Sequence, residues 1–227
     1  MAAPSAPRPA ALDPAPWWAG PVLAVGMAVL IGLVGPLALF NPWFVSLEQS
    51  RNDVPSRLGA TRAQTDRMTG QILCDLLFSC DDFSEALDGG PPLLTDDERS
   101  HMRDVGNLVR TLAVLVGLAA VGVLLALRAL RGRRRQVGRL FVTAAALVGA
   151  LALIAGAVFA AAFDAAFLAF HELFFPQGNF LFGPDSNLLK LFPEGFWFES
   201  SMVAGLTILL GAVVVGMVGW RMTRGTA

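Results

Sequence analysis

LVRTLAVLVGLAAVGVLLAL (108–127), RALRGRRRQVGR (128–139) and LFVTAAALVGALALIAGAVFAAA (140–162) are the consecutive segments that decide the fold. Each of the two apolar runs is long enough to cross a hydrocarbon core of about 30 Å. The link between them carries six arginines. Because the backbone must satisfy its own hydrogen bonds in lipid, each run is predicted to be a helix. This stretch therefore indicates a membrane protein with a strongly basic turn between two spans.

Two further apolar runs, at 18–40 and 201–220, bring the expected number of membrane helices to four. The first run is too long for a cleaved signal peptide, and the residues 39–41 (LFN) do not form a small-residue cleavage site. The chain is 55% hydrophobic and 15% charged, which excludes a disordered chain and a highly charged nucleic-acid binder. The predicted fold class is an all-α membrane protein with four transmembrane helices.

The charges predict the orientation of these helices. Positively charged loops stay in the cytoplasm, so the link 128–139 and the C-terminal residues Arg221 and Arg224 are expected there. With four spans, both termini are then cytoplasmic, and segments 41–106 and 163–200 face outward. All acidic residues except Asp13 fall in those two segments.

These boundaries also predict the domain organisation. Residues 1–17 are a Pro/Ala-rich tail that is expected to be disordered. Residues 18–220 form a single four-helix membrane domain with two structured extracytoplasmic segments. Residues 221–227 are a cytoplasmic tail.

The first outer segment is too long for a plain loop and is expected to contain short helices. RAQTDRMTGQILCDLLF (62–78) places Met68, Ile72 and Leu76 at helical spacing. Such a helix either lies on the outer membrane surface or caps the bundle.

Cys74 and Cys80 belong to the same outer segment, where an oxidising compartment permits a disulfide. In one continuous helix the two residues would be about 9 Å apart by rise alone, too far for a bond. A disulfide therefore requires the helix to end between them, near Ser79; two free thiols are the alternative. Electron transfer to a quinone is disfavoured because the chain lacks a CxxC pair and a second cysteine pair.

A capping-box pattern, Thr95 followed by Glu98, predicts the start of a helix that continues into the second span. This helix would carry His101 about two turns outside the membrane core. Asp97 at i−4 and Asp104 at i+3 are both within reach of that imidazole.

The second outer segment is rich in aromatic residues but interrupted by polar ones. Helix three is predicted to continue to about Phe175, before Pro176, so that Asp164 and His171 share one helical face. Residues 176–199 contain glycines and prolines that predict irregular backbone, forming an aromatic lid over the bundle. An interfacial aromatic belt explains residues 196–198 but not the polar residues that interrupt this segment.

Histidine is the side chain best suited to proton transfer near neutral pH, and the chain has only His101 and His171. The short link between helices two and three predicts that these helices are antiparallel neighbours. Both imidazoles would then face one outer cavity, although either could be merely structural. His171 and Glu172 begin an HExxH zinc motif, but Phe175 occupies its last position, so no metal site is predicted.

Two blocks, HMRDV (101–105) and FHELFFPQGNFLFGPDSNLLKLFPEGFW (170–197), resemble the bacterial lipoprotein intramolecular transacylase family, called Lit. The resemblance covers the topology and both outer blocks but not the Ala-rich spans. This sequence has Phe180 where the family often has Trp, and Phe192-Pro193-Glu194 where Leu-Pro-Glu is usual.

The resemblance implies an enzyme of the bacterial cytoplasmic membrane that acts at the extracytoplasmic leaflet. Its substrate is a membrane-anchored lipoprotein with a diacylglyceryl group on its N-terminal cysteine. One ester-linked acyl chain moves to the amine of that cysteine, which leaves a lyso-form lipoprotein. The reaction requires no cofactor, no soluble acyl donor and no nucleic acid partner.

The resemblance also implies roles for particular residues. His101, oriented by Asp104 or Asp97, is expected to act as the base and His171 as the acid, although the two roles could be exchanged. Asn179 and backbone amides near Gly178 are candidates for stabilising an oxyanion. Asp164, Glu172, Lys190 and Glu194 are candidate supporting residues.

A different class of function also fits the sequence. A non-enzymatic membrane scaffold or regulator would use structural histidines and bind a partner through its outer segments. Whether lipoproteins keep a free N-terminal amine in a host that lacks other N-acylating enzymes distinguishes the two hypotheses.

Overall fold

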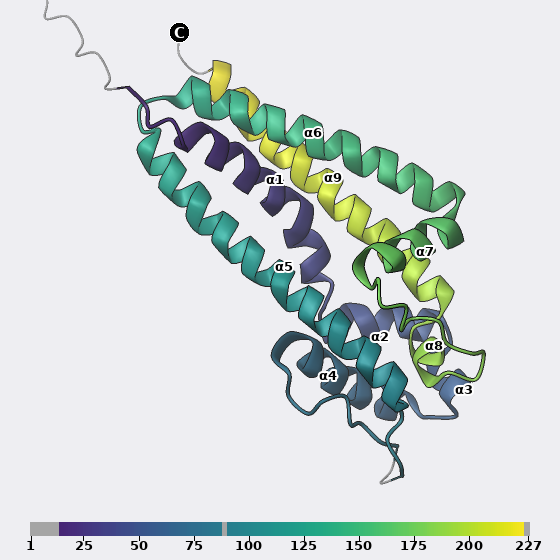
Figure 1. The fold of residues 1–227 in the computed structure, drawn as a ribbon. Helices are drawn as coiled ribbons and strands as arrows, with labels where there is room; N and C mark the ends of the chain where they lie inside the picture. Colours follow the sequence, from purple (N-terminus) through teal and green to yellow (C-terminus); the bar gives the residue numbers. More distant parts are fainter. Residues whose placement is uncertain (1–13, 88–89, 225–227) are drawn as a thin grey trace, which may run out of the picture.

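A computed structural model describes residues 14–87 and 90–224, and its regular structure is helical (Figure 1). The described helices are α1 (Ala19–Ala38), α2 (Pro42–Arg51), α3 (Val54–Leu58), α4 (Arg62–Phe78), α5 (Asp96–Ala129), α6 (Arg134–Ala161), α7 (Phe163–Phe174), α8 (Asn187–Leu191) and α9 (Glu194–Arg224). The predicted N-terminal tail lies outside the described residues for its first 13 positions, and the last three residues of the C-terminal tail do as well.

Four of these helices, α1, α5, α6 and α9, are long and apolar enough to cross a membrane. Large apolar side chains on their outer faces, such as Leu118, Leu151 and Leu210, are more than half exposed. A surface of this kind is stable against lipid and not against water. The predicted all-α membrane fold with four spans is confirmed.

The spans pack in an order that differs from the predicted one. α6 packs along α9, and α1 packs against both of them. α5 packs mainly against α1 (Figure 1). Gly138 and Gly219 let α6 and α9 approach closely, since a Cβ atom on Gly138 would lie 2.6 Å from the Gly219 carbonyl oxygen. The prediction that helices two and three are packed neighbours was wrong, because α1 separates α5 from α6.

The third predicted span has its expected end, but the helix does not continue beyond it as predicted. α6 stops at Ala161, and Ala162 leaves helical geometry with φ −147° and ψ 57° before α7 begins. Figure 1 shows α7 turned back from the end of α6 toward α5. A straight helix would have carried His171 about 15 Å beyond Ala161 along the α6 axis. The predicted continuous helix to Phe175 was wrong, and the turn changes where His171 lies.

An outer layer of short helices covers the end of the bundle around the start of α5. Its core includes Phe44, Val54, Ile72, Leu191 and Phe196. The predicted helix 62–78 is confirmed as α4, and the apolar face that the sequence predicted for it is buried in this core. This arrangement supports the interpretation of α4 as a cap on the bundle.

Irregular backbone is confined to a shorter stretch than predicted. Residues 175–186 are irregular, but α8 begins at Asn187 and α9 begins at Glu194. The Ser186 side chain caps α8 by accepting a hydrogen bond from the Leu189 amide. The prediction of irregular backbone over 176–199 was therefore wrong for the residues that form α8 and the start of α9.

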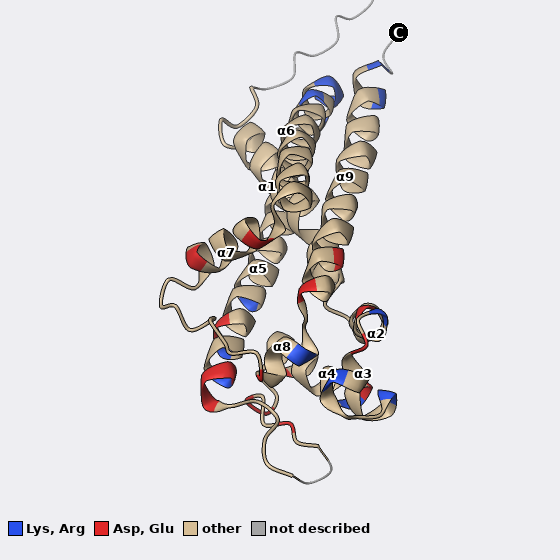
Figure 2. Ribbon diagram, turned by 90° about the vertical axis from the view of Figure 1, so that its right-hand side faces the viewer, with Lys and Arg blue, Asp and Glu red and all other residues tan. Residues whose placement is uncertain are grey.

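The acidic residues lie toward one end of the molecule. Figure 2 shows Lys and Arg at the start of α6 and the end of α9, whereas the opposite end carries Asp and Glu together with further Lys and Arg. The outer helices α2, α3, α4 and α8 lie at that opposite end.

Cys74 and Cys80 are joined by a disulfide, with 5.7 Å between their Cα atoms. α4 ends at Phe78, and Ser79 takes left-handed geometry with φ 56°, so the chain turns between the two cysteines. The bond closes a short loop beside Leu73 and Leu76, which are buried in the outer core.

Replacing both cysteines with serine is expected to lower the free energy of unfolding by about 2 kcal/mol, because a short closed loop restricts the unfolded chain only modestly. The measurement is thermal unfolding in detergent, with and without reductant. Reductant should lower the unfolding temperature of the wild type but not that of the serine variant. An equal shift in both proteins would show that reductant acts elsewhere.

Candidate active site

His101 lies in the part of α5 that precedes the apolar run 108–127, and only 5% of it is exposed. The predicted capping box begins this helix: the Thr95 side chain accepts from the Glu98 amide, and the Glu98 carboxylate accepts from the Thr95 amide at 2.8 Å. The cap sets the first turn of α5 and hence the position of the imidazole one and a half turns later.

The two histidines lie together, with their ring centroids 5.9 Å apart and their planes at 26°. Phe175 and Phe182 pack edge-on against His101, with centroid distances of 4.9 and 5.7 Å. Phe167 lies 4.2 Å from the centroid of His171. The two imidazoles therefore form one stacked pair inside an aromatic enclosure, brought together by the turn at Ala162.

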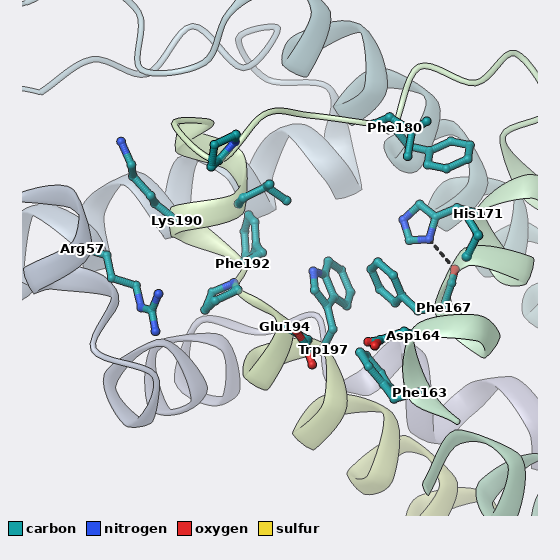
Figure 3. A pocket seen from close by; sticks show the side chains of 15 residues that line it. Arg57, Phe163, Asp164, Phe167, His171, Phe180, Lys190, Phe192, Glu194 and Trp197 are labelled. Atoms are coloured by element: carbon teal, nitrogen blue, oxygen red, sulfur yellow. Dashed lines mark hydrogen bonds between the residues drawn. The ribbon is translucent and has the colours of Figure 1, made fainter. Parts of the chain in front are cut away.

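The tautomer of His171 follows from its hydrogen bond. Its Nδ1 lies 2.8 Å from the carbonyl oxygen of Phe167, one turn earlier in α7. A carbonyl only accepts hydrogen bonds, so Nδ1 carries the hydrogen and Nε2 of the neutral ring keeps a free lone pair. Figure 3 shows the other side of the ring turned into the cavity.

The surroundings lower the pKa of both histidines. For His101 the main cause is burial, followed by the neighbouring His171, while the Asn179 side chain and Asp104 act in the opposite direction. For His171 burial lowers the pKa and the hydrogen bond to Phe167 opposes it. Both rings are therefore neutral at neutral pH, as proton acceptors must be.

Neither predicted acidic partner bonds to His101 directly. Asp104 Oδ2 instead accepts hydrogen bonds from Gln177 Nε2 at 2.7 Å and Asn179 Nδ2 at 2.8 Å. Asp97 is exposed and forms no hydrogen bond or ion pair with His101 within the described ranges. Asp104 thus fixes the 175–186 segment against α5, and the predicted orienting role of Asp97 is wrong.

A cavity of about 500 Å³ opens beside His171 (Figure 3). It is lined by α3, α7, α8 and the start of α9, and the predicted residues that it brings together are His171, Asp164, Lys190 and Glu194. Asp164 and His171 share one face of α7, as expected from their spacing. His101 is not part of the lining and is buried next to His171.

The remaining predicted residues lie outside this cavity. Glu172 is exposed on α7 and does not line the cavity. The Gly178 amide donates to the Phe175 carbonyl at 3.0 Å, so this one of the predicted backbone amides is not a free oxyanion donor. One amide hydrogen of Asn179 is engaged by Asp104, and its Oδ1 is buried without a hydrogen-bond partner.

Several contributing residues were missed by sequence analysis. Gln177 bonds to Asp104, while Arg57 and Trp197 line the cavity. Glu98 was identified only as a helix cap, yet it also accepts hydrogen bonds from Ser186 and from the Leu188 amide. These contacts join segments about 90 residues apart, for which no local pattern gives a signal.

No group of three or more His, Cys, Asp or Glu side chains converges as a metal site within residues 14–87 and 90–224. The chemistry that the described residues can supply is proton transfer by the histidine pair next to a partly apolar cavity.

Comparisons with known proteins identify one family. The model of the family described as lipoprotein intramolecular transacylase Lit matches residues 22–197. No curated protein matches the chain.

Among solved structures, the chain is similar to the membrane-integral lipoprotein intramolecular transacylase Lit from Bacillus cereus, with 18% identity and a TM-score of 0.79 over 91% of this chain and 95% of that one. Two variants of the Bacillus cereus protein with a single histidine replaced are also similar. The arginine variant has a TM-score of 0.72 at 17% identity, covering 91% of each chain. The alanine variant has a TM-score of 0.68 at 18% identity, covering 91% of this chain and 93% of that one.

Proposed function

Because the chain belongs to the lipoprotein intramolecular transacylase family Lit, we propose that His171, positioned by His101, is the proton-transfer group of its intramolecular acyl transfer. The substrate is a lipoprotein whose N-terminal cysteine carries a diacylglyceryl group. The single observation that carries the assignment is the histidine pair, in which His171 turns a free Nε2 into the cavity.

The reaction is balanced within one substrate molecule. The cysteine amine attacks the carbonyl carbon of an ester in the lipid, forming a C–N bond, while His171 Nε2 takes a proton from the nitrogen. The tetrahedral intermediate then expels the glycerol oxygen, breaking the C–O bond. The imidazolium returns the proton to that oxygen, which leaves an amide and a free hydroxyl. The reaction therefore requires no second substrate.

The positions and hydrogen bonds of the two histidines indicate which of them acts on the substrate. His171 lines the cavity and has a defined tautomer, whereas His101 is buried next to it with its Nδ1 free of partners. His101 is thus a positioning residue that packs against His171 and limits its rotation. Asp104 supports this arrangement by holding Gln177 and Asn179.

Holding the amine and the ester in contact is the other task of the cavity. Well-oriented groups within one molecule can gain roughly 7–11 kcal/mol relative to separate reactants. Phe167, Phe192 and Trp197 give the wall an apolar surface suited to lipid. The polar members, Asp164 and Lys190, suit the charged N-terminus and the peptide.

The charge distribution supports an orientation in the bacterial cytoplasmic membrane. The arginine-rich link and the end of α9 would be cytoplasmic, together with both termini (Figure 2). The histidine pair, at the opposite end, would then work at the extracytoplasmic leaflet, where a lipidated N-terminus is anchored. Residues 18–220 would act as a single membrane domain.

Expression in a host that lacks any other N-acylating enzyme tests the function. We expect its lipoproteins to change from a free amine to an N-acyl lyso-form of identical total mass, because the acyl chain only moves within the molecule. Tandem mass spectrometry of N-terminal peptides distinguishes the two isomers. Lipoproteins that keep a free amine at normal levels of the protein would exclude the transacylase activity.

The pH dependence of kcat/KM should reveal two groups. The substrate amine has a pKa of about 7.7–8.0 and must be deprotonated, and His171 must be neutral with a pKa below its usual value. We expect log(kcat/KM) to fall with a slope of one below about pH 8. The slope should reach two only at pH values below about 6.5.

Initial rates on one lipopeptide in detergent micelles give this profile. A slope that reaches two already near pH 7 would contradict the lowered pKa of His171.

A further inference from the structure

The cavity has a cationic end opposite His171. Arg57 from α3 and Lys190 from α8 lie on one side of it, while His171 and Asp164 from α7 lie on the other (Figure 3). The two cations come from elements about 130 residues apart in the sequence and meet only because α3 packs on α8. Their convergence on one cavity is a property of the fold and not of a local charge run.

Neither cation is neutralised within the described part of the chain. Arg57 Nε donates to the Asn52 carbonyl at 2.9 Å, and Lys190 Nζ donates to Asn187 Oδ1 at 3.3 Å. No described carboxylate lies within 4.0 Å of either group. Glu194, which also lines the cavity, is drawn beside Trp197 (Figure 3). Two uncompensated cations at one end of a cavity favour an anionic ligand.

The position of this end indicates which part of a lipoprotein reaches it. Figures 1 and 2 show α3 and α8 farther than α7 from the arginine-rich end of the bundle. Acyl chains must stay level with the spanning helices, whereas the peptide after the lipidated cysteine leaves the membrane. A substrate peptide that runs from the reaction centre at His171 away from the membrane therefore passes Arg57 and Lys190.

We propose that Arg57 and Lys190 bind carboxylate side chains in the first residues after the lipidated cysteine, so that the enzyme prefers lipoproteins with an acidic N-terminal segment. This inference rests on the proposed function of the same cavity. A phospholipid phosphate is disfavoured because it lies next to the glycerol esters, at the level of the reaction centre, whereas α3 and α8 lie farther than α7 from the arginine-rich end of the bundle.

The test compares three synthetic diacylated lipopeptides that differ only after the cysteine, with two aspartates, two serines or two lysines. They are assayed in micelles of a neutral detergent with the full-length protein. We expect kcat/KM to be about fivefold higher for the aspartate peptide than for the serine peptide, and lowest for the lysine peptide. Partly exposed ion pairs have effects of this size. The difference should lie in KM.

Variants of the enzyme test whether Arg57 and Lys190 cause the preference for the acidic peptide. In the double variant Arg57→Glu, Lys190→Glu the preference should reverse in favour of the lysine peptide, an outcome that a misfolded protein cannot give. Arg67→Gln is the matched control, because Arg67 is an exposed arginine of α4 outside the cavity. This control should keep both the rate and the preference of the wild type.

The outcomes separate the two proposals. Equal kcat/KM for all three peptides with the wild type overturns the peptide preference and leaves the transacylase function intact. No product from any peptide contradicts the function itself. If the preference for the aspartate peptide persists in the charge-reversed variant, Arg57 and Lys190 do not bind the peptide. The same conclusion follows if the variant changes only the response of the rate to added anionic phospholipid.

Discussion

Replacing His171 with phenylalanine should lower the rate of acyl transfer about 10²- to 10⁴-fold, the usual contribution of a general base. Phenylalanine preserves the ring that packs against Phe167 and His101 but removes the nitrogen that faces the cavity. The loss should appear in kcat, because the base acts on the amine proton in the transition state and not on substrate binding.

The neighbouring Glu172 provides the control for this variant. Glu172 is on the same helix, exposed and outside the cavity, so Glu172→Gln should retain the wild-type rate. Rates are measured on a single lipopeptide at equal amounts of folded protein, judged by gel filtration in detergent. Wild-type turnover by the phenylalanine variant would remove His171 from the mechanism.

Local patterns made several elements predictable. The spans follow from apolar length, and α4 has the predicted bounds because its apolar positions repeat at helical spacing. The start of α5 follows from the Thr95–Glu98 capping box. In each case the signal and the structure lie within the same few residues.

The convergence of the histidines was predicted for a reason that proved wrong. α5 and α6 were expected to be packed neighbours, but α1 separates them. His171 reaches His101 because the chain turns at Ala162, inside a run of alanines and phenylalanines that contains no glycine or proline. Such a run favours a continuous helix, so packing of α7 and not local propensity decides the turn.

The supporting contacts of the site could not be read from sequence spacing. Asp104 was expected to bond to His101, one turn away, but it binds Gln177 and Asn179 on the irregular segment instead. Arg57 joins the cavity only through the contact of α3 with α8. Long-range pairs of this kind depend on how the outer helices pack.

Glu98→Ala is expected to destabilise the outer layer strongly. Glu98 is 2% exposed, and its carboxylate accepts hydrogen bonds from Thr95, from the Ser186 hydroxyl and from the Leu188 amide at 3.0 Å. Removing it leaves the buried Leu188 amide and the partly buried donors of Thr95 and Ser186 without this acceptor. A buried group without its partner costs about 1–3 kcal/mol, and a partly buried one costs less. We expect a loss of about 3 kcal/mol, or roughly 6–12 °C in the unfolding temperature.

The same change should also affect catalysis, since Glu98 anchors the segment that carries Phe182 against His101. The matched control is Asp97→Ala, which removes an exposed carboxylate from the same helical turn and should cost less than about 1 kcal/mol. Thermal unfolding in detergent measures both variants. If the two variants unfolded at the same temperature, Glu98 would act only as a helix cap, and the bond between α5 and the start of α8 would contribute nothing to stability.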